Sequence, residues 1–336
     1  MNHLHKIIII LLSLFLLNSC VSEKKQVEVA FLFNDFNIPR WEREANLFKD
    51  RISELGGAVT IKVANGDDIM QHSQAKEMIE KGVDVIVITV SNAVTAAAIV
   101  REAHDKGIKI IAYDGLILNA DLDYLVGFDL QKVGELQAQY ILDKKPKGNY
   151  VLLNGDKAHT AAFEMYSGVL KVLKPSIENG NINIIYTGWM ENWLGTNANY
   201  YFDKIFEFSD KKIDAVIAAN DGIAGGVADV LRARGLQNQI LVTGQDGDLS
   251  ACNRILNGEQ TMTVYKSSKL IAYGAADLAY KVANNEKITN LQPRFNGRVK
   301  VPSLILDPIV VDKNNIETTI VAEGIYTMEE IRNYSK

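Results

Sequence analysis

The chain has 336 residues, of which 47% are hydrophobic and 23% are charged, and its formal net charge is −5. These values are typical of a globular protein with about two domains at ~150 residues each, and they exclude a disordered or fibrous chain. A mildly acidic chain without a cluster of Lys and Arg lacks the electrostatic footprint of a nucleic-acid-binding protein.

The N-terminus reads MNHLHKIIIILLSLFLLNSC. Lys6 precedes an apolar run from Ile7 to Leu17, which is too short for a membrane-spanning helix of ~20 residues. The run and the cysteine that follows resemble a bacterial lipoprotein signal, in which the cysteine becomes the acylated N-terminus. We therefore expect a signal peptide over residues 1–20, lipidation of Cys20 and a polar tether over residues 21–26. The alternative is a signal peptide cleaved nearby, with an incidental cysteine.

Either signal predicts that the mature protein is exported to the periplasm or the cell surface. With a lipidated Cys20, the lipid also anchors the protein to a membrane.

The first half of the mature chain alternates apolar runs of strand length with stretches of helical periodicity. Runs such as VDVIVITV and IKIIAY are apolar throughout, as expected of parallel strands that helices cover on both faces. The predicted elements are strand 27–33, helix 40–55, strand 59–64, helix 70–81, strand 83–90, helix 94–106 and strand 108–113. Repeated strand–helix units predict a doubly wound α/β sheet.

A second set of elements follows the same rhythm. Its predicted strands are 150–154, 182–186, 215–219, 240–243 and 262–265, and its predicted helices are 161–173, 196–208, 223–234 and 249–256. Two such sets predict two Rossmann-like lobes that face each other across a cleft.

No low-complexity linker separates the two sets, so we expect several short crossings rather than one tether. The expected crossings lie near Phe128-Asp129, Lys266 and Pro302–Leu306. The N-terminal lobe would then comprise residues 27–128 and 267–303, and the C-terminal lobe residues 129–266 and 304–336.

Ligands of open parallel sheets bind beyond the carboxyl ends of the strands. The residues at these positions are rich in carboxylate, carboxamide, cationic and indole groups. A sugar needs such planar hydrogen-bonding groups for its hydroxyls and an aromatic plate for its C–H face. The candidate ligand-binding residues are the plates Trp41 and Trp193, the acceptors Asp114, Asn220 and Asp246, the donors Arg40 and Lys266, and His159 at the end of a strand.

Enzymatic signatures are lacking: no phosphate loop, dinucleotide-binding loop, nucleophile elbow or zinc-protease motif occurs. The alternative with most chemical content is a glycosidase with Asp114 and Asp246 as acid and base. The GIAGG stretch over residues 222–226 lacks the Lys-Ser/Thr of a phosphate loop, and we interpret it as close helix packing. Cys20 and Cys252 can build neither a disulfide framework nor a thiolate metal site unless they meet in space. We expect no metal and no cofactor.

Longer stretches resemble the periplasmic sugar-binding proteins of the ribose/galactose-binding type, and most closely the D-xylose-binding proteins of ABC transporters. The resemblance covers nearly the whole mature chain. Its carriers are RW at 40–41, ANG at 64–66, GVDVIVI at 82–88, IAYD at 111–114, KVGELQA at 132–138, GNY at 148–150, KVLKP at 171–175, NWL at 192–194, KIDAVIAAND at 212–221, GQDGDL at 244–249, TMTVYK at 261–266 and DKNNI at 312–316.

The resemblance implies a type 1 periplasmic binding protein fold, in which sugar in the cleft closes the lobes and a membrane permease recognises the closed form. It implies a binding protein rather than an enzyme, acting as a monomer. The alternative partner of the closed form is a membrane sensor kinase. The implied sugar contacts are Arg40, Asp114, Trp193, Asn220, Asp246 and Lys266, with Trp193 stacked on the sugar ring.

Two positions depart from the family pattern. Gly115 stands where the xylose binders have an arginine, and Thr160-Ala161 stand where they have an asparagine pair. Either water or His159 replaces the missing groups and the ligand is D-xylose, or the space beside Gly115 admits the hydroxymethyl group of a hexose. The sequence leaves both open.

Overall fold

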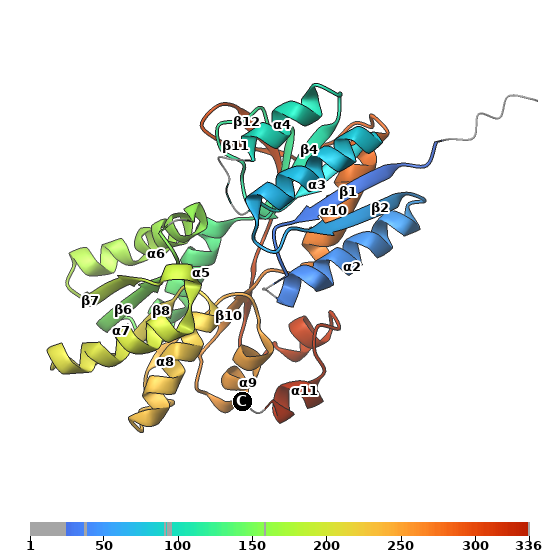
Figure 1. Cartoon of the computed structure of the whole chain (residues 1–336). Coiled ribbons are helices and arrows are strands. Elements are labelled where there is room, and N and C mark those ends of the chain that lie inside the picture. Colours follow the sequence, from blue (N-terminus) through green and yellow to red (C-terminus); the bar gives the residue numbers. More distant parts are fainter. Residues whose placement is uncertain (1–24, 37–38, 91, 93–95, 158, 335–336) are drawn as a thin grey trace, which may run out of the picture.

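The computed structural model describes residues 25–36, 39–90, 92, 96–157 and 159–334. It folds into two α/β lobes joined by several segments (Figure 1). The first lobe contains a seven-stranded sheet in the order β11-β12-β5-β4-β3-β1-β2. Its strands are Glu28–Phe33 (β1), Ala58–Val63 (β2), Val85–Ile88 (β3), Lys109–Tyr113 (β4), Tyr124–Phe128 (β5), Gln292–Phe295 (β11) and Lys300–Leu306 (β12). All neighbouring pairs are parallel except β11 with β12.

Helices cover both faces of this sheet because successive strand residues point to opposite sides. The odd-numbered Val29, Phe31 and Phe33 pack against Pro39–Glu54 (α2) and Ser268–Ala283 (α10). The even-numbered Ala30 and Leu32 pack against Asp68–Lys81 (α3) and Ala97–His104 (α4). The apolar runs in the sequence therefore form strands buried on both faces, as predicted.

The second lobe contains a parallel sheet in the order β7-β6-β8-β9. Its strands are Gly148–Asn154 (β6), Ile182–Trp189 (β7), Ala215–Ala218 (β8) and Leu241–Val242 (β9). Leu130–Lys144 (α5) and Thr160–Glu178 (α6) pack on one face, and Gly195–Phe208 (α7) and Asp221–Ala233 (α8) on the other. The two doubly wound α/β lobes predicted from the sequence are thus confirmed.

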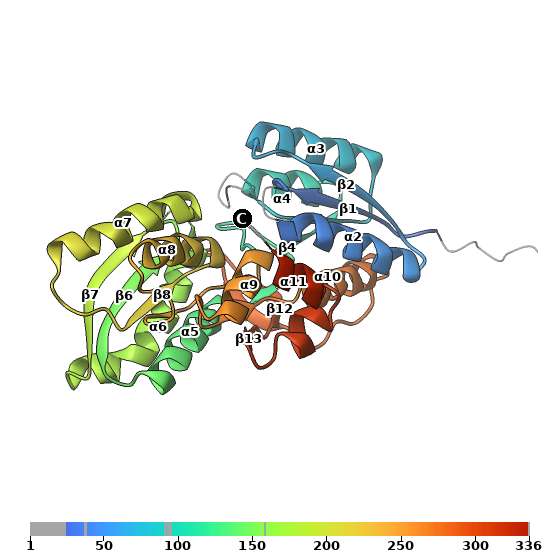
Figure 2. The ribbon, with the colours of Figure 1, turned by 90° about the horizontal axis from the view of Figure 1, so that it is seen from below.

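Smaller elements complete the second lobe. They are the 3-10 turn Glu191–Trp193 (η1), Leu249–Asn257 (α9), Thr263–Tyr265 (β10), Ile309–Val311 (β13), the π-helix Glu317–Val321 (η2) and Met328–Asn333 (α11). Strands β10 and β13 pair with each other in a separate sheet. Helices α9 and α11 lie side by side in both views (Figure 1 and Figure 2).

The chain passes between the lobes three times: after β5, between β10 and α10, and after β12. The first and third passages touch, because the amide of Asp129 donates to the carbonyl of Leu306 at 3.2 Å. The third passage follows Leu306, the last residue of the expected stretch 302–306, because β12 stays paired with β5 as far as Leu306 and Phe128. The boundary expected after residue 303 accordingly falls inside β12.

The C-terminal segment braces the second passage. Glu323 accepts hydrogen bonds from the hydroxyl of Tyr265 at 3.0 Å and from the hydroxyl of Ser267 at 2.7 Å. These two residues flank Lys266, so the crossing residue is held on both sides.

The expected signal peptide and Cys20 lie outside the described residues, as does most of the expected tether. Within the described ranges, none of the helices combines the length and the apolar character that a bilayer crossing demands.

Glycines allow helices α7 and α8 to pack closely. A Cβ atom on Gly226 of α8 would lie 2.0 Å from the carbonyl oxygen of Gly195 at the start of α7. This confirms that the GIAGG stretch serves helix packing.

Gly226→Ala should therefore destabilise the protein by about 1–3 kcal/mol or more, because the helices must separate. Urea unfolding checks this; Gly222→Ala is the matched control, since its Cβ would meet nothing closer than 3.6 Å. Equal stability of the two variants would contradict the packing role.

Candidate ligand-binding site

The first group of candidate residues surrounds Arg40 in the first turn of α2. The Arg40 guanidinium bonds Asp114, which directly follows β4, and its Nη1 donates to Glu44 at 3.0 Å. Its side chain is only 9% exposed. Glu44 also accepts from the hydroxyls of Tyr113 at 2.8 Å and Ser268 at 3.1 Å. Helix α2, strand β4 and the start of α10 are thus tied together by one buried carboxylate.

The members of this ion cluster differ in how strongly their surroundings favour the charged form. Burial disfavours the charged form of Arg40, but Asp114 and Glu44 outweigh it and raise the pKa of Arg40. Burial likewise opposes ionisation of Asp114, yet the charges of Arg40 and Lys266 prevail and lower the pKa of Asp114. For Glu44 burial dominates and raises the pKa. Asp114 is therefore an ionised hydrogen-bond acceptor at neutral pH.

Asp246 and Lys266 form the second part of the same cluster. Lys266 Nζ lies 3.4 Å from Asp246 Oδ1, and the lysine side chain is 7% exposed. Asp246 is close enough to Arg40 to contribute to its raised pKa. Four of the candidate residues, Arg40, Asp114, Asp246 and Lys266, are thus brought together from both sides of the crossing.

Trp193, His159 and Asn220 form a separate group in the second lobe. The indole nitrogen of Trp193 donates to His159 Nδ1 at 2.8 Å, and the two rings are near-parallel, 23° apart. The ring lies directly over Gly155, where a Cβ would be 2.2 Å from it. Because of its hydrogen bond to the indole nitrogen, His159 orients the ring of Trp193. Among the residues that the structure describes, no hydrogen bond joins this group to the Arg40 cluster.

Asn220 and Trp41 make contacts within the protein that the sequence did not predict. Asn220 was expected to act as an acceptor, but its Oδ1 caps α8 by accepting from the amide of Ile223 at 2.8 Å. Its amide nitrogen, a donor, remains for a ligand. Trp41 was expected to be an aromatic plate, but the Arg40 guanidinium lies 4.0 Å above its ring, and the ring also packs near Phe33 and Tyr113. Trp41 therefore supports Arg40.

Three candidate residues have left-handed backbone conformations, with φ of 63° at Asp114, 106° at Asp246 and 57° at Trp193. Such conformations are costly for residues other than glycine, asparagine and aspartate. Trp193 is the one described residue outside these three types with a positive φ. Backbone strain of this kind is concentrated at functional sites, so the conformation of Trp193 favours its place among the candidate ligand-binding residues.

Two further carboxylates of the second lobe are close enough to Asp246 to be affected by its charge. Burial raises the pKa of Asp221 to about 6 and that of Asp248 to about 8. Asp221 accepts from the amides of Gly247 and Asp248 at 2.8 and 2.9 Å, and so holds the turn that follows Asp246. Sequence reasoning missed Asp221 and Glu44 as supports. A carboxylate four residues after Arg40, on the face of α2 that packs inward, was the available signal for Glu44.

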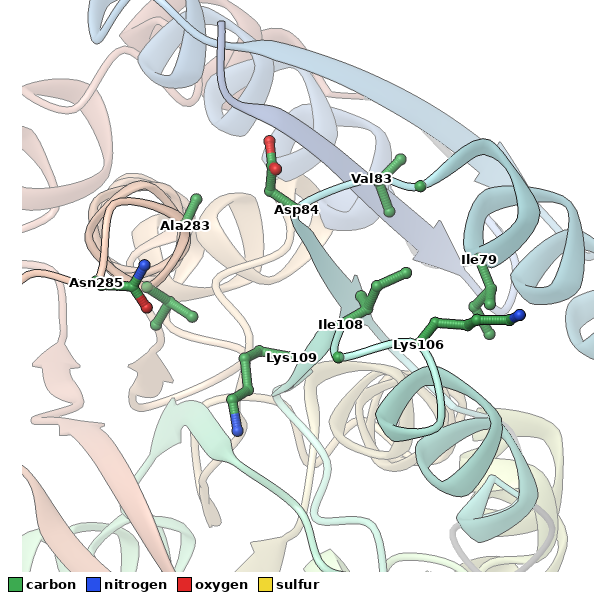
Figure 3. Close-up of a pocket in the computed structure, with 11 residues that line it drawn as sticks. Ile79, Val83, Asp84, Lys106, Ile108, Lys109, Ala283 and Asn285 are labelled. Carbon is green, nitrogen blue, oxygen red and sulfur yellow. The ribbon is translucent and has the colours of Figure 1, made fainter. Parts of the chain in front are cut away.

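A surface pocket of about 460 Å³ lies elsewhere, at the amino ends of β3 and β4 (Figure 3). It is lined by residues such as Asp84, Lys106, Lys109 and Asn285. It is therefore at the opposite edge of the sheet from Asp114. Within the described part of the chain, no group of three or more His, Cys, Asp or Glu side chains is arranged to hold a metal ion.

Two α/β lobes with three passages between them, and ionic side chains gathered at the strand ends beside those passages, define a two-lobed solute-binding protein. The model of the periplasmic binding protein domain matches residues 29–287, and the chain belongs to that family.

Similar proteins support this assignment over nearly the full length. The D-xylose-binding periplasmic protein of Haemophilus influenzae is 40% identical over 313 residues, covering 93% of this chain and 94% of the relative. The protein of the same name from Escherichia coli is 38% identical over 325 residues, covering 97% and 98%. A carbohydrate transporter solute-binding protein from Chloroflexus aurantiacus, solved with D-glucose, superposes with a TM-score of 0.82 at 26% identity, covering 91% and 98%.

Proposed function

We propose that this chain binds a monosaccharide outside the cytoplasm and delivers it to an ABC permease by closure of its lobes. The observation that carries the proposal is the state of Asp114. One carboxylate oxygen pairs with Arg40, while the other is buried and has no hydrogen-bond partner among the described residues. An ionised, oriented acceptor of this kind suits a sugar hydroxyl. Trp193 offers the aromatic plate for the C–H face of the ring.

The ligand we propose is D-xylose or a related pentose or hexose. The relatives favour D-xylose. The space beside Gly115 favours a larger sugar, since a Cβ atom there would meet nothing within 4 Å. Both ligands use the same acceptors, so the mechanism does not depend on which one is bound. Lobe closure follows from differential affinity, because only the closed form offers the contacts of both lobes at once.

The remaining parts of the proposal concern location and chemistry. We propose that Cys20 carries the lipid anchor and that the protein acts as a monomer without catalytic activity. The glycosidase alternative needs a protonated acid at neutral pH, and the lowered pKa of Asp114 disfavours that role. Absence of turnover on aryl glycosides tests this point.

A thermal-shift screen of the purified protein against pentoses and hexoses tests the proposal. A ligand that binds only the folded form raises stability by about 4 kcal/mol at a thousandfold excess over Kd. We expect a shift with D-xylose, with a hexose or with both, and a much smaller one for Trp193→Ala at equal sugar concentration. No shift with any monosaccharide would overturn the proposed function. Undiminished affinity of Trp193→Ala would remove the indole from the site.

A further inference from the structure

Several buried side-chain oxygen atoms have no hydrogen-bond partner in the described structure. Within the described ranges, four side chains carry such an atom: Asn34 Oδ1, Gln74 Oε1, Asp114 Oδ1 and Gln245 Oε1. Buried acceptors without a partner destabilise a folded protein and are rare in native structures. Three of the four follow strands β1, β4 and β9, whose carboxyl ends lie on the ligand-binding edge of each sheet.

The side-chain amide of Asn34 is held in one orientation. Its amide nitrogen donates to Asp35 Oδ2 at 2.6 Å, and its backbone amide donates to the hydroxyl of Thr89 at 2.9 Å. The nitrogen is thus engaged, and the oxygen is the free end of the group. Asn34 lies between β1 and α2, and the first turn of α2 carries Arg40.

Gln245 is held in the same way in the second lobe. It is 5% exposed, and its side-chain nitrogen donates to Asp246 Oδ1 at 2.8 Å. Its backbone oxygen accepts from the amide of Asp221 at 2.9 Å. The side-chain oxygen therefore stays beside Asp246 with no group of the described protein to satisfy it.

We propose that Asn34 and Gln245 are two further ligand-binding residues, one in each lobe, and that both accept hydrogen bonds from hydroxyl groups of the bound sugar. The inference rests on the proposed function and extends it. Together with Asp114, these residues require three donors from the ligand. The site therefore selects monosaccharides whose hydroxyls are free to donate at three positions, and it rejects derivatives that are methylated or fluorinated there.

Calorimetric titration with D-xylose, D-glucose and their monodeoxyfluoro analogues tests the donor requirement on the unaltered protein. Fluorine replaces a hydroxyl at similar size but donates no hydrogen bond. We expect at least three positions of the better-bound sugar at which fluorine weakens binding fivefold or more. Fewer than three such positions would overturn the proposal.

Variants assign each position to its acceptor. Asn34→Leu and Gln245→Leu should each weaken binding of the unmodified sugar at least tenfold. Gln74→Leu is the matched control: its Oε1 is also buried and unpartnered, but its nitrogen bonds the carbonyl of Val63 on the edge strand β2, and its affinity should change less than twofold.

A double-mutant cycle separates direct contact from a structural role. For each variant, one fluoro analogue should bind as well as the parent sugar, because the acceptor that read that hydroxyl is gone. A loss of the same size for every analogue would overturn direct contact. If the unaltered protein binds neither parent sugar, the proposed function fails; if it binds one but Asn34→Leu and Gln245→Leu bind equally well, only this inference fails.

Discussion

Replacing Asp114 by alanine is expected to lower sugar affinity at least 100-fold. The change removes the buried acceptor oxygen and leaves the guanidinium of Arg40 without one of its two carboxylate partners. Truncating one member of a buried, hydrogen-bonded charge pair costs about 2–5 kcal/mol, and a 100-fold loss corresponds to about 2.7 kcal/mol. Calorimetric titration with D-xylose and D-glucose measures the loss directly.

Asp277→Ala provides the control for this prediction. Asp277 on α10 accepts from Arg51 of the same helix α2 at 2.7 Å, but this pair is at the surface, and the aspartate side chain is 38% exposed. Its removal should leave affinity within about twofold, since exposed ion pairs contribute little. Affinity of Asp114→Ala equal to that of the control would remove Asp114 from the site.

Replacing Gly115 by arginine is expected to shift selectivity from hexose to pentose by at least tenfold. The position is exposed, its backbone is not left-handed, and a Cβ would contact nothing within 4 Å. An arginine side chain therefore fits there without backbone strain and fills the space beside Asp114. It would exclude a hydroxymethyl group while offering a new donor to a pentose hydroxyl. The ratio of the Kd values for D-glucose and D-xylose measures the shift.

Gly115→Ala is the control that separates the effect of a large side chain at position 115 from the effect of replacing glycine. The methyl group is too small to reach across the open space, so the ratio of the two Kd values should stay within about twofold of the original. If arginine changes both Kd values by the same factor, residue 115 does not discriminate between the sugars, and the choice of ligand depends on other residues.

The fold was predictable to the extent that its signals are local. Apolar runs identified β1, β3, β4, β6 and β8, because each is buried on both faces. Strand β5 (YLVGF) is equally apolar but was missed, and the run of β12 (KVPSLIL) is interrupted by Pro302 and Ser303. The two strands pair through residues far apart in the chain, such as Leu125 with Ser303. Such pairing is set by tertiary contacts, which a local pattern does not contain. Strand β7 extends three residues further than predicted, to Trp189, because Thr187, Gly188 and Trp189 continue to pair with the end of β6.

The candidate site was predictable in composition but not in orientation. Strand-end position and side-chain chemistry led to Arg40, Asp114, Asp246 and Lys266, and the structure gathers these four. The roles of single atoms depend on neighbours that the sequence does not place. The oxygen of Asn220 caps a helix, and the face of Trp41 is covered by Arg40. Glu44 was missed because its importance arises from three partners on three different elements.

Glu44 and Glu323 hold the second passage from its two ends. The hydrogen bonds of Glu44 to Arg40, Tyr113 and Ser268 fasten the first turn of α10 to the first lobe, while Glu323 fastens Tyr265 and Ser267 to the second. The two anchors overlap, because Ser267 also caps α10 by accepting from the amide of Leu270 at 3.1 Å, and the amide of Ser268 donates to the hydroxyl of Tyr265 at 3.3 Å. The passage is therefore a continuous series of hydrogen bonds rather than a loose linker. A sugar that contacts Lys266, as proposed, would touch the connection between the lobes itself.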